Sequence, residues 1–314
     1  MKEPRPSPTR SAGSCPPRWA TPRSPERQTF GPRVAAVAKL FLPRGQELMP
    51  WQRMVADVAG EYTQSAAGEI RLSYQQVVVL TPRQSGKTSW LLAQEVDRAI
   101  NWGGPQRIAY TAQTGKDARA KLIVDQAVLL RASPLSKAFG VHVFSAAGSE
   151  AITFGNGSRI GIVYPGHSGG GRGQTIDLGI VDEAQDDVDD MREAGLAPTM
   201  ITRANSQLLI ASTAGFETSV YLSGKVAAGR DAVTNGVRSG IAYFEWSAPD
   251  GAPIDAETTW EGCMPAYGIT VDPTKIRAEF QVREEGTFRR EYLNQWTTAK
   301  QSLISEALWN AVCE

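Results

Sequence analysis

The sequence has few of the residues that build metal or disulfide sites. Its 314 residues include only three cysteines and two histidines, all widely separated. No CxxC pair or local His/Cys cluster can be assembled from them, which argues against zinc and disulfide chemistry. Long apolar runs are also lacking: no stretch approaches the ~20 residues that span a bilayer, and the first residues have no secretory-signal core. We therefore expect a cytosolic protein with no membrane partner.

The chain also lacks net charge, with 33 Lys and Arg against 33 Asp and Glu. Residues 1–33, however, carry one Lys and six Arg against two Glu, a net charge of +5 that leaves −5 for residues 34–314. This segment holds eight of the 19 prolines and almost no aliphatic side chains. It cannot offset the entropy of ordering, so we predict a disordered basic arm. The arm is either a solvated tail, such as a start codon placed too early would give, or a segment that touches nucleic acid.

Strand and helix signals alternate along the rest of the chain. Short apolar runs predict strands at 76–80, 107–112, 176–181 and 207–211, and helices are predicted at 89–102 and 116–131. Asn156-Gly157 predicts a hairpin. This order indicates an α/β fold, an open and mostly parallel sheet flanked by helices over residues 34–239. Residues 240–314, with a charged helical stretch at 274–296, are predicted to form a smaller subdomain. Functional groups should lie at the carboxyl ends of the strands.

Residues 81–88 connect a buried-type strand to a helix, which is the setting of a phosphate-binding loop. Backbone N–H groups at the helix start surround phosphates, Lys87 would contact the β and γ oxygens, and the Thr88 hydroxyl can ligate Mg²⁺. Arg83 is a second candidate phosphate contact. The usual pattern has glycine where this chain has Thr81. The predicted ATP-binding residues of the loop are Thr81, Pro82, Arg83, Gln84, Ser85, Gly86, Lys87 and Thr88.

A second strand, over 176–181, ends in two adjacent carboxylates, Asp182 and Glu183. Successive strand residues point in opposite directions, so one carboxylate can reach a metal ion while its neighbour addresses a water molecule. We predict Asp182 as a Mg²⁺ ligand and Glu183 as the general base. An acidic surface run would explain a single carboxylate, but it would not explain the pairing with the phosphate loop. The two motifs together predict binding and hydrolysis of ATP with Mg²⁺.

Three further candidates have weaker signals. Arg172, in a glycine-rich loop, could stabilise charge on a transferring phosphoryl group, or it could simply contact solvent or DNA. Gln52 could hydrogen-bond adenine, or belong to an ordinary amphipathic helix start. Ser212 and Thr213, at the end of a strand, could sense the γ-phosphate, or mark a polar strand-to-turn transition.

Taken in chain order, the motifs resemble the ATPase half of a tailed-phage terminase large subunit. The resemblance covers roughly residues 45–310 and includes a variant phosphate loop that accommodates Thr81. Its most specific parts are that loop and the late tryptophan-containing segments. The motifs are PWQ (50–52), TPRQSGKT (81–88), YTAQT (110–114), GGGRGQTIDLGIVDEAQ (169–185), LLIASTAG (208–215), WEGCMPAYG (260–268) and FRREYLNQW (288–296).

The resemblance implies a P-loop NTPase fold of the ASCE/RecA-like type with a small C-terminal lid. It implies that Gln52 contacts adenine, that Arg83, Lys87 and Thr88 hold phosphates and metal, and that Arg172 is an arginine finger for the neighbouring subunit. Asp182 and Glu183 would address the metal and the attacking water. Ser212, Thr213 and Ala214 would couple hydrolysis to movement of the lid.

The function implied is a DNA-stimulated ATPase that moves double-stranded viral DNA into a procapsid. Implied partners are DNA, the portal protein, the small terminase subunit and further copies of the chain in a ring, usually of five. The complex would dock transiently on the procapsid in the host cytoplasm and be absent from the mature virion. Large terminases normally continue into a nuclease domain where this chain stops, so no nuclease activity is expected here. The alternatives are a helicase-like DNA-dependent ATPase and an inactive prophage remnant.

Overall fold

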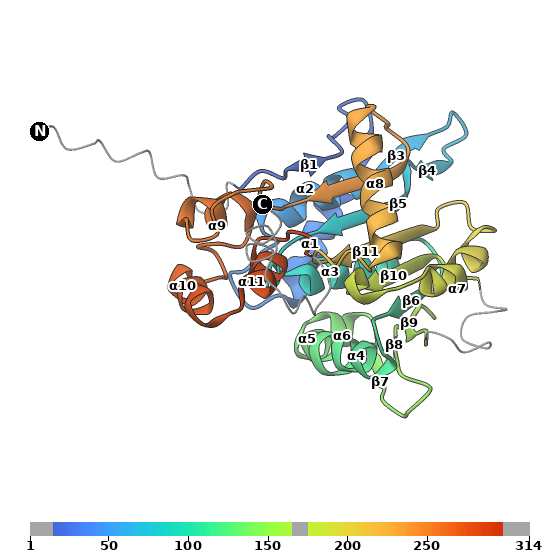
Figure 1. The fold of residues 1–314 in the computed structure, drawn as a ribbon. Coiled ribbons are helices and arrows are strands. Elements are labelled where there is room, and N and C mark those ends of the chain that lie inside the picture. The colour runs from blue at the N-terminus through green and yellow to red at the C-terminus, as the bar shows by residue number, and fades with distance from the viewer. Residues whose placement is uncertain (1–14, 165–174, 298–314) are drawn as a thin grey trace, which may run out of the picture.

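The computed structural model describes residues 15–164 and 175–297, and a large sheet runs through its centre (Figure 1). The strands of this sheet are β1 (Trp19–Ala20), β5 (Tyr74–Leu80), β6 (Arg107–Thr111), β7 (His142–Phe144), β8 (Ala151–Thr153), β9 (Arg159–Ile162), β10 (Leu178–Asp182), β11 (Gln207–Ser212) and β12 (Gly240–Glu245). Their spatial order is β1-β12-β5-β11-β10-β6-β9-β8-β7. The strands from β12 to β9 run parallel, whereas β1 and β8 pair antiparallel with their neighbours. The predicted hairpin is β8–β9. A small antiparallel sheet contains β2 (Gln28–Thr29), β3 (Glu61–Gln64) and β4 (Ile70–Leu72).

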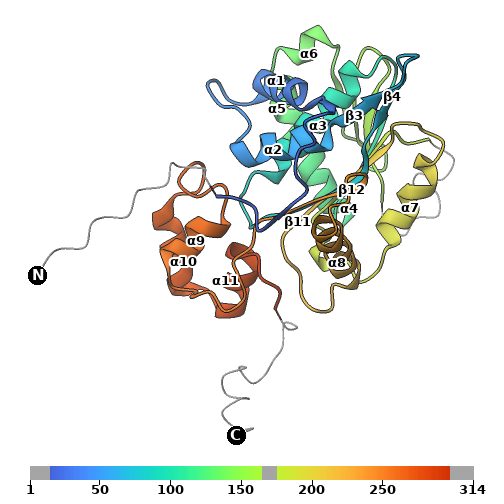
Figure 2. The ribbon, with the colours of Figure 1, turned by 90° about the horizontal axis from the view of Figure 1, so that it is seen from above.

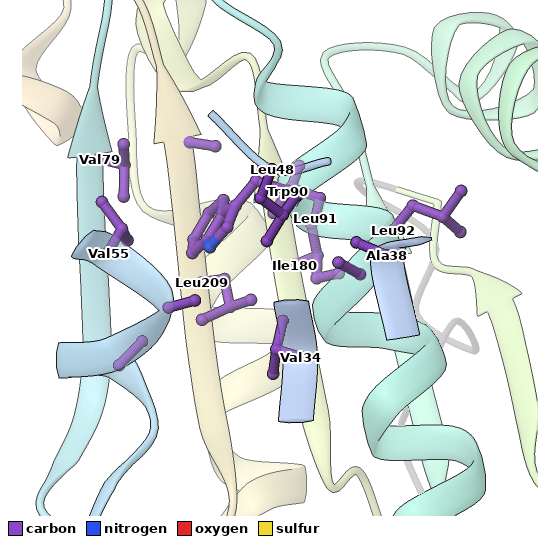
Figure 3. Close-up of a cluster of buried hydrophobic side chains, with 14 of the residues drawn as sticks. Val34, Ala38, Leu48, Val55, Val79, Trp90, Leu91, Leu92, Ile180 and Leu209 are labelled. Atoms are coloured by element: carbon purple, nitrogen blue, oxygen red, sulfur yellow. The ribbon is translucent and has the colours of Figure 1, made fainter. Parts of the chain in front are cut away.

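Helices cover both faces of the large sheet (Figure 2). One face packs against α1 (Gly31–Phe41), α2 (Pro50–Ala59) and α3 (Lys87–Asn101), and the other against α7 (Met191–Met200) and α8 (Val220–Thr234). Strand residues alternate between the two cores: Val79 faces α2 and α3, and Val78 faces α8. Figure 3 shows Trp90 and Leu91 of α3 between α1 and the strands. Because helices cover both faces of the sheet, both sides of its central strands are buried. This explains why those strands are continuous apolar runs in the sequence.

The helical segment predicted at 116–131 contains an irregularity. It begins as α4 (Gly115–Arg119), continues as a π-helix, η1 (Ala120–Gln126), and ends as α5 (Ala127–Ala132) before α6 (Leu135–Ala138). Wider π-turns shift the side chains that follow them relative to an α-helix, and they are frequent at functional sites. Periodicity in the sequence did not indicate this change.

The strand order places β11 between β5, which leads into the phosphate loop, and β10, which ends in Asp182. Register pairs Ser212 with Leu80 and Asp182 with Ala211, so the three strands end at nearly the same level. The predicted α/β class, a mostly parallel sheet flanked by helices, is confirmed. Parallel strands direct their carboxyl ends to one edge, and the loops that carry the motifs meet there.

A helical lid follows the sheet, with α9 (Glu257–Cys263), α10 (Pro273–Val282) and α11 (Glu285–Tyr292) at one end of the molecule (Figure 2). Its interior is aromatic: Phe288 contacts Trp260, Phe280 and Tyr292, with ring centroids 5.0–5.9 Å apart. The single helical stretch predicted at 274–296 is two helices, because Glu284 accepts hydrogen bonds from the N–H groups of Gly286 and Thr287 and so caps a new helix.

The predicted boundary at residue 240 is wrong. Residues 240–245 form β12, which pairs with β5 in the middle of the large sheet. The sheet therefore extends to Glu245, and the lid begins after it. Scattered tryptophans suggested a separate unit, but Trp246 is fully buried and packs edge-on against Trp51 of α2.

The predicted disorder of residues 1–33 is wrong for residues 15–33, and residues 1–14 lie outside the described part. Residues 15–33 need no core of their own, because β1 pairs with β12 and α1 already begins at Gly31. Their positive charge meets buried acidic groups of the body. Arg23 and Arg27 both pair with fully buried Glu61, and Arg33 forms two hydrogen bonds of 2.7 and 2.8 Å with Asp97.

Within 15–164 and 175–297, every helix is too short or too polar to cross a membrane.

Candidate nucleotide site

The phosphate loop has an unusual backbone that its sequence permits. Gln84 and Gly86 both have positive φ values, 60° and 87°. A Cβ on Gly86 would lie 2.7 Å from Met49 and 2.9 Å from the Gln52 amide, so only glycine fits there. The Ser85 hydroxyl closes the loop by donating to the Pro82 carbonyl at 2.8 Å. The loop then passes directly into α3 at Lys87, as a helix-N-terminal anion site requires.

Two side chains of α2 hold this loop from behind. Trp51 Nε1 donates to the Ser85 carbonyl at 3.0 Å, and Gln52 Nε2 donates to the Gly86 carbonyl at 2.7 Å. Gln52 Oε1 also accepts from the backbone N–H of Met49 at 2.7 Å. Both ends of the Gln52 amide thus have partners within the protein. Its predicted contact with adenine stays a prediction, and its observed role is to fix the loop.

In front of the loop lies a cavity of about 500 Å³. Lys87, Thr88 and Glu183 line it together with five polar residues to which the sequence analysis gave no role: Gln113, Asp117, Lys121, Gln185 and Asp186. Lys121 comes from the π-helix η1 and lines the same cavity as the phosphate loop. Two lysines therefore face the space in which a phosphate chain would lie. The sequence could not predict a role for Lys121, because only the fold brings the residues after β6 to the cavity beside the phosphate loop.

The two carboxylates after β10 differ in environment. Asp182 is buried, accepts from the Tyr110 hydroxyl at 2.5 Å, and lies behind the cavity wall, whereas Glu183 lines the cavity. Burial raises the pKa of Asp182, and the charge of Glu183 raises it further. Burial would also raise the pKa of Glu183, but Lys87 and Gln185 outweigh this and hold it below its ordinary value. Glu183 therefore remains ionised at neutral pH.

Glu183 also has a strained backbone, with φ at 52°. Its N–H bonds the Ala211 carbonyl at 2.9 Å, and a short helix, η2 (Ala184–Asp186), starts directly after it. Such strain is often found where a side chain must be aimed. The conformation turns the chain away from the sheet at the position that carries the cavity-facing carboxylate.

The oxygen donors at this edge suit Mg²⁺, which prefers carboxylates, phosphates and water. Thr88 lines the cavity, and Asp182 is a buried carboxylate at the end of β10, next to cavity-lining Glu183. Magnesium ions usually keep several of their waters, so a buried carboxylate can hold the ion from behind the wall. The residues present thus fit the predicted metal, and their roles as ligands stay predictions.

A second cavity, of about 530 Å³, opens on the other side of the loop, and Gln84 and Gly86 line both. Its walls come from the chain before α2 and from the lid, including Gln46, Met49, Gln52, Thr270, Lys275 and Tyr292. The two cavities therefore border the same two residues of the phosphate loop.

The lid contacts the phosphate loop itself. The backbone N–H of Arg83 donates to the Glu291 carbonyl of α11 at 2.8 Å, and the Arg83 side chain lies 3.7 Å from the Glu291 carboxylate. Arg83 also lines the first cavity, as its predicted phosphate contact requires. Arg172 lies outside the described residues.

The predicted coupling residues lie next to both motifs. Ser212 ends β11 and its hydroxyl bonds Gln185 Oε1 at 2.7 Å. Its carbonyl accepts from the Thr81 N–H, at the start of the phosphate loop, at 3.1 Å. Thr213 and Ala214 follow, both buried. The structure therefore brings Ser212–Ala214 to the candidate site, and their coupling role stays a prediction.

Solved structures with a similar fold are phage large terminases. The large terminase of bacteriophage HK97 matches 90% of this chain with 22% identity and a TM-score of 0.68. The large terminase of a thermophilic bacteriophage matches 74% with 12% identity and a TM-score of 0.52, and the match covers 51% of that protein. The ATPase domain of a Thermus phage large terminase matches 72% with 16% identity and a TM-score of 0.50, and the match covers 90% of that domain. No protein-family model and no curated protein matches the chain.

The structural similarity establishes the fold, which is that of large terminase ATPase domains. The predicted P-loop fold is confirmed. This chain spans 58% of the length of the HK97 protein and about half of the protein from the thermophilic bacteriophage.

Proposed function

We propose that this chain hydrolyses ATP as the motor part of a terminase large subunit, which moves double-stranded DNA into a viral procapsid. The observation that carries the proposal is the cavity that Lys87, Lys121 and Glu183 line together at the carboxyl edge of the sheet. A protein with a related fold, the large terminase of the thermophilic bacteriophage, has been solved in complex with ADP.

The chemistry follows from the charges around the cavity. The backbone N–H groups at the start of α3 and the Lys87 ammonium would bind the β- and γ-phosphates. Lys121 would approach the γ-phosphate from the opposite wall and stabilise the charge on its oxygens. Glu183, kept ionised, would orient the attacking water. Mg²⁺, held by Thr88 and Asp182, would neutralise phosphate charge when bound.

The second cavity would take the nucleoside. It lies beyond Gly86 and is lined by α10 of the lid, so the base end of ATP would touch both the core and the lid. Gln52 lines this cavity, where its amide edge would contact adenine as the sequence resemblance implies.

The remaining parts of the motor follow from the same resemblance. Arg172 would act as the arginine finger of a neighbouring subunit in a ring of five, and Ser212, Thr213 and Ala214 would couple hydrolysis to the lid. The ring would bind DNA, the portal protein and the small terminase subunit while docked on the procapsid in the host cytoplasm. A nuclease domain is outside the proposal for this polypeptide.

The test is ATP hydrolysis by the purified chain, with and without linear double-stranded DNA, compared with Lys87→Ala. We expect DNA to stimulate ATP turnover by the unaltered protein. We expect the Lys87→Ala variant to show no turnover, because the phosphates lose their buried cation. Equal and negligible turnover in both proteins would instead indicate an inactive remnant. Strand separation of a duplex substrate would favour the helicase-like alternative.

A further inference from the structure

Asn294 occupies the point where the chain returns from the lid to the sheet. It follows α11 by two residues, is 1% exposed, and has a φ of 53°. Left-handed backbone is rare outside glycine, although asparagine tolerates it better than most residues. A buried polar side chain needs hydrogen-bond partners, and a left-handed backbone at a residue other than glycine needs an explanation.

The hydrogen-bonding reason is that its amide bridges two loops. Asn294 Oδ1 accepts from the Ala214 N–H at 2.5 Å, and Asn294 Nδ2 donates to the Trp246 carbonyl at 2.7 Å. Ala214 lies two residues after β11, and Trp246 directly follows β12. The side chain therefore joins the exits of two different strands.

Those two strands lie on either side of β5, which leads into the phosphate loop. The Trp246 N–H donates to the Leu80 carbonyl at 2.9 Å, and the Thr81 N–H donates to the Ser212 carbonyl at 3.1 Å. Both segments held by Asn294 are thus hydrogen-bonded to the base of the loop. A shift of the loop on nucleotide binding would reach Asn294 from both sides.

The segment after Asn294 continues the contact along the same loop. Thr297 pairs in parallel with Phe216, and its carbonyl accepts from the Glu217 N–H at 3.1 Å. On the other side, the Ser212 hydroxyl donates to Gln185 Oε1 at 2.7 Å, and Gln185 lines the cavity in front of the phosphate loop. The short backbone segment 212–217 is therefore hydrogen-bonded to cavity-lining Gln185 at one end and to the chain that follows the lid at Ala214 and Glu217.

We propose that Asn294 is a positioning residue that links occupancy of the phosphate loop to the position of the lid, through its bonds to Ala214 and Trp246. This inference rests on the proposed function. It assigns the connection between the lid and the phosphate loop to one side chain at the end of the lid. The sequence motifs gave this side chain no role. Asparagine suits this position because its amide supplies an acceptor and a donor at once and because it tolerates the left-handed backbone.

The test uses three variants of the full chain. Asn294→Gly keeps the left-handed backbone and removes both bonds. Asn294→Asp keeps the acceptor for Ala214 and loses the donor to Trp246. Gln295→Ala is the matched control, because Gln295 is also a buried amide but bonds only within the lid, to Pro249 and Arg289. For each we would measure turnover, affinity for a fluorescent ATP analogue, and amide exchange of residues 273–293 with and without Mg²⁺ and AMP-PNP.

In the unaltered chain we expect the nucleotide to change amide exchange across α10 and α11. Asn294→Gly should abolish that change and lower turnover roughly tenfold or more, as loss of coupling between two sites would, while affinity stays within about threefold. Gln295→Ala should keep the response. Asn294→Asp should lose about half of the nucleotide-dependent change in amide exchange. If Asn294→Gly does not fold, the result for Asn294→Asp tests the inference.

A full nucleotide response in Asn294→Gly, or in Asn294→Asp where only that variant folds, would overturn the inference. Equal loss in Gln295→Ala would also overturn it, because general packing would then be the cause. If the unaltered chain shows no Lys87-dependent hydrolysis, the proposed function fails and the inference falls with it. If hydrolysis is present and only the lid response is independent of Asn294, the inference alone fails.

Discussion

The two ends of the candidate nucleotide site are built differently. At the phosphate end, the ends of β5, β10 and β11 meet, and buried Trp51 and Gln52 fix the loop backbone. At the base end, the cavity wall is shared with the lid, whose charged side chains Asp272 and Lys275 are exposed. The phosphate end is preorganised by the core, and the base end depends on where the lid lies.

This difference indicates which parts of the site would carry out hydrolysis and which would respond to movement of the lid. Electrostatic stabilisation of a transferring phosphoryl group needs groups held in fixed positions, which a buried sheet edge provides. The lid wall of the base cavity is separate from that edge and is joined to it at the Arg83–Glu291 contact and at Asn294. Variants at the phosphate end should therefore change turnover, and variants at the base end should change apparent affinity.

The largest effect is expected at Glu183. Glu183→Gln keeps the size of the side chain but removes the charge that would orient water, so turnover should fall about a thousandfold, within the range for loss of a general base. Nucleotide affinity should change little, because the phosphate contacts remain. Steady-state hydrolysis and binding of a fluorescent ATP analogue measure the two quantities.

Asp189→Asn is the control for Glu183, since it alters the exposed acidic run nearby. It should behave as the unaltered chain. If both variants lost turnover equally, general acidity of the surface would be responsible, and the contrast between the two ends of the site would lose its main support.

A smaller effect is expected for Lys121→Ala. One charge-assisted hydrogen bond contributes about 1.5–3 kcal/mol, so kcat should fall roughly tenfold to a hundredfold. Lys121→Arg should restore part of the rate, and Lys116→Ala, an exposed lysine on neighbouring α4, should have no effect. Unchanged kcat in Lys121→Ala would remove the second cation from the proposed mechanism and leave the phosphate end with Lys87 alone.

The sequence was sufficient for those parts of the site that depend on local order. A buried strand followed by residues 81–88, and a second strand ending in Asp182 and Glu183, predicted the two motifs that the fold brings together. Parallel strands place such loops at one edge whatever their separation in the chain.

Other parts depended on contacts that spacing does not encode. Lys121 reaches the cavity from a π-helix, and Asn294 bridges segments that lie 80 and 48 residues away along the chain. The segment 15–33 was misjudged for a related reason. Its composition excludes a core of its own, but Glu61 and Asp97 supply buried partners that composition cannot reveal.

The smallest effect is expected at the base end of the site. It tests whether the lid affects nucleotide affinity without affecting the chemical step. Lys275 of α10 lines the base cavity from an exposed position, so Lys275→Ala should raise KM about two- to fivefold, the loss of one solvent-exposed hydrogen bond, and leave kcat unchanged. Arg277→Ala is the matched control on the same helix, because Arg277 pairs with Glu257 and does not line the cavity. Initial rates over a range of ATP concentrations separate the two constants. A fall in kcat for Lys275→Ala without a rise in KM would mean that the lid takes part in the chemical step, and the two ends of the site would then act as one.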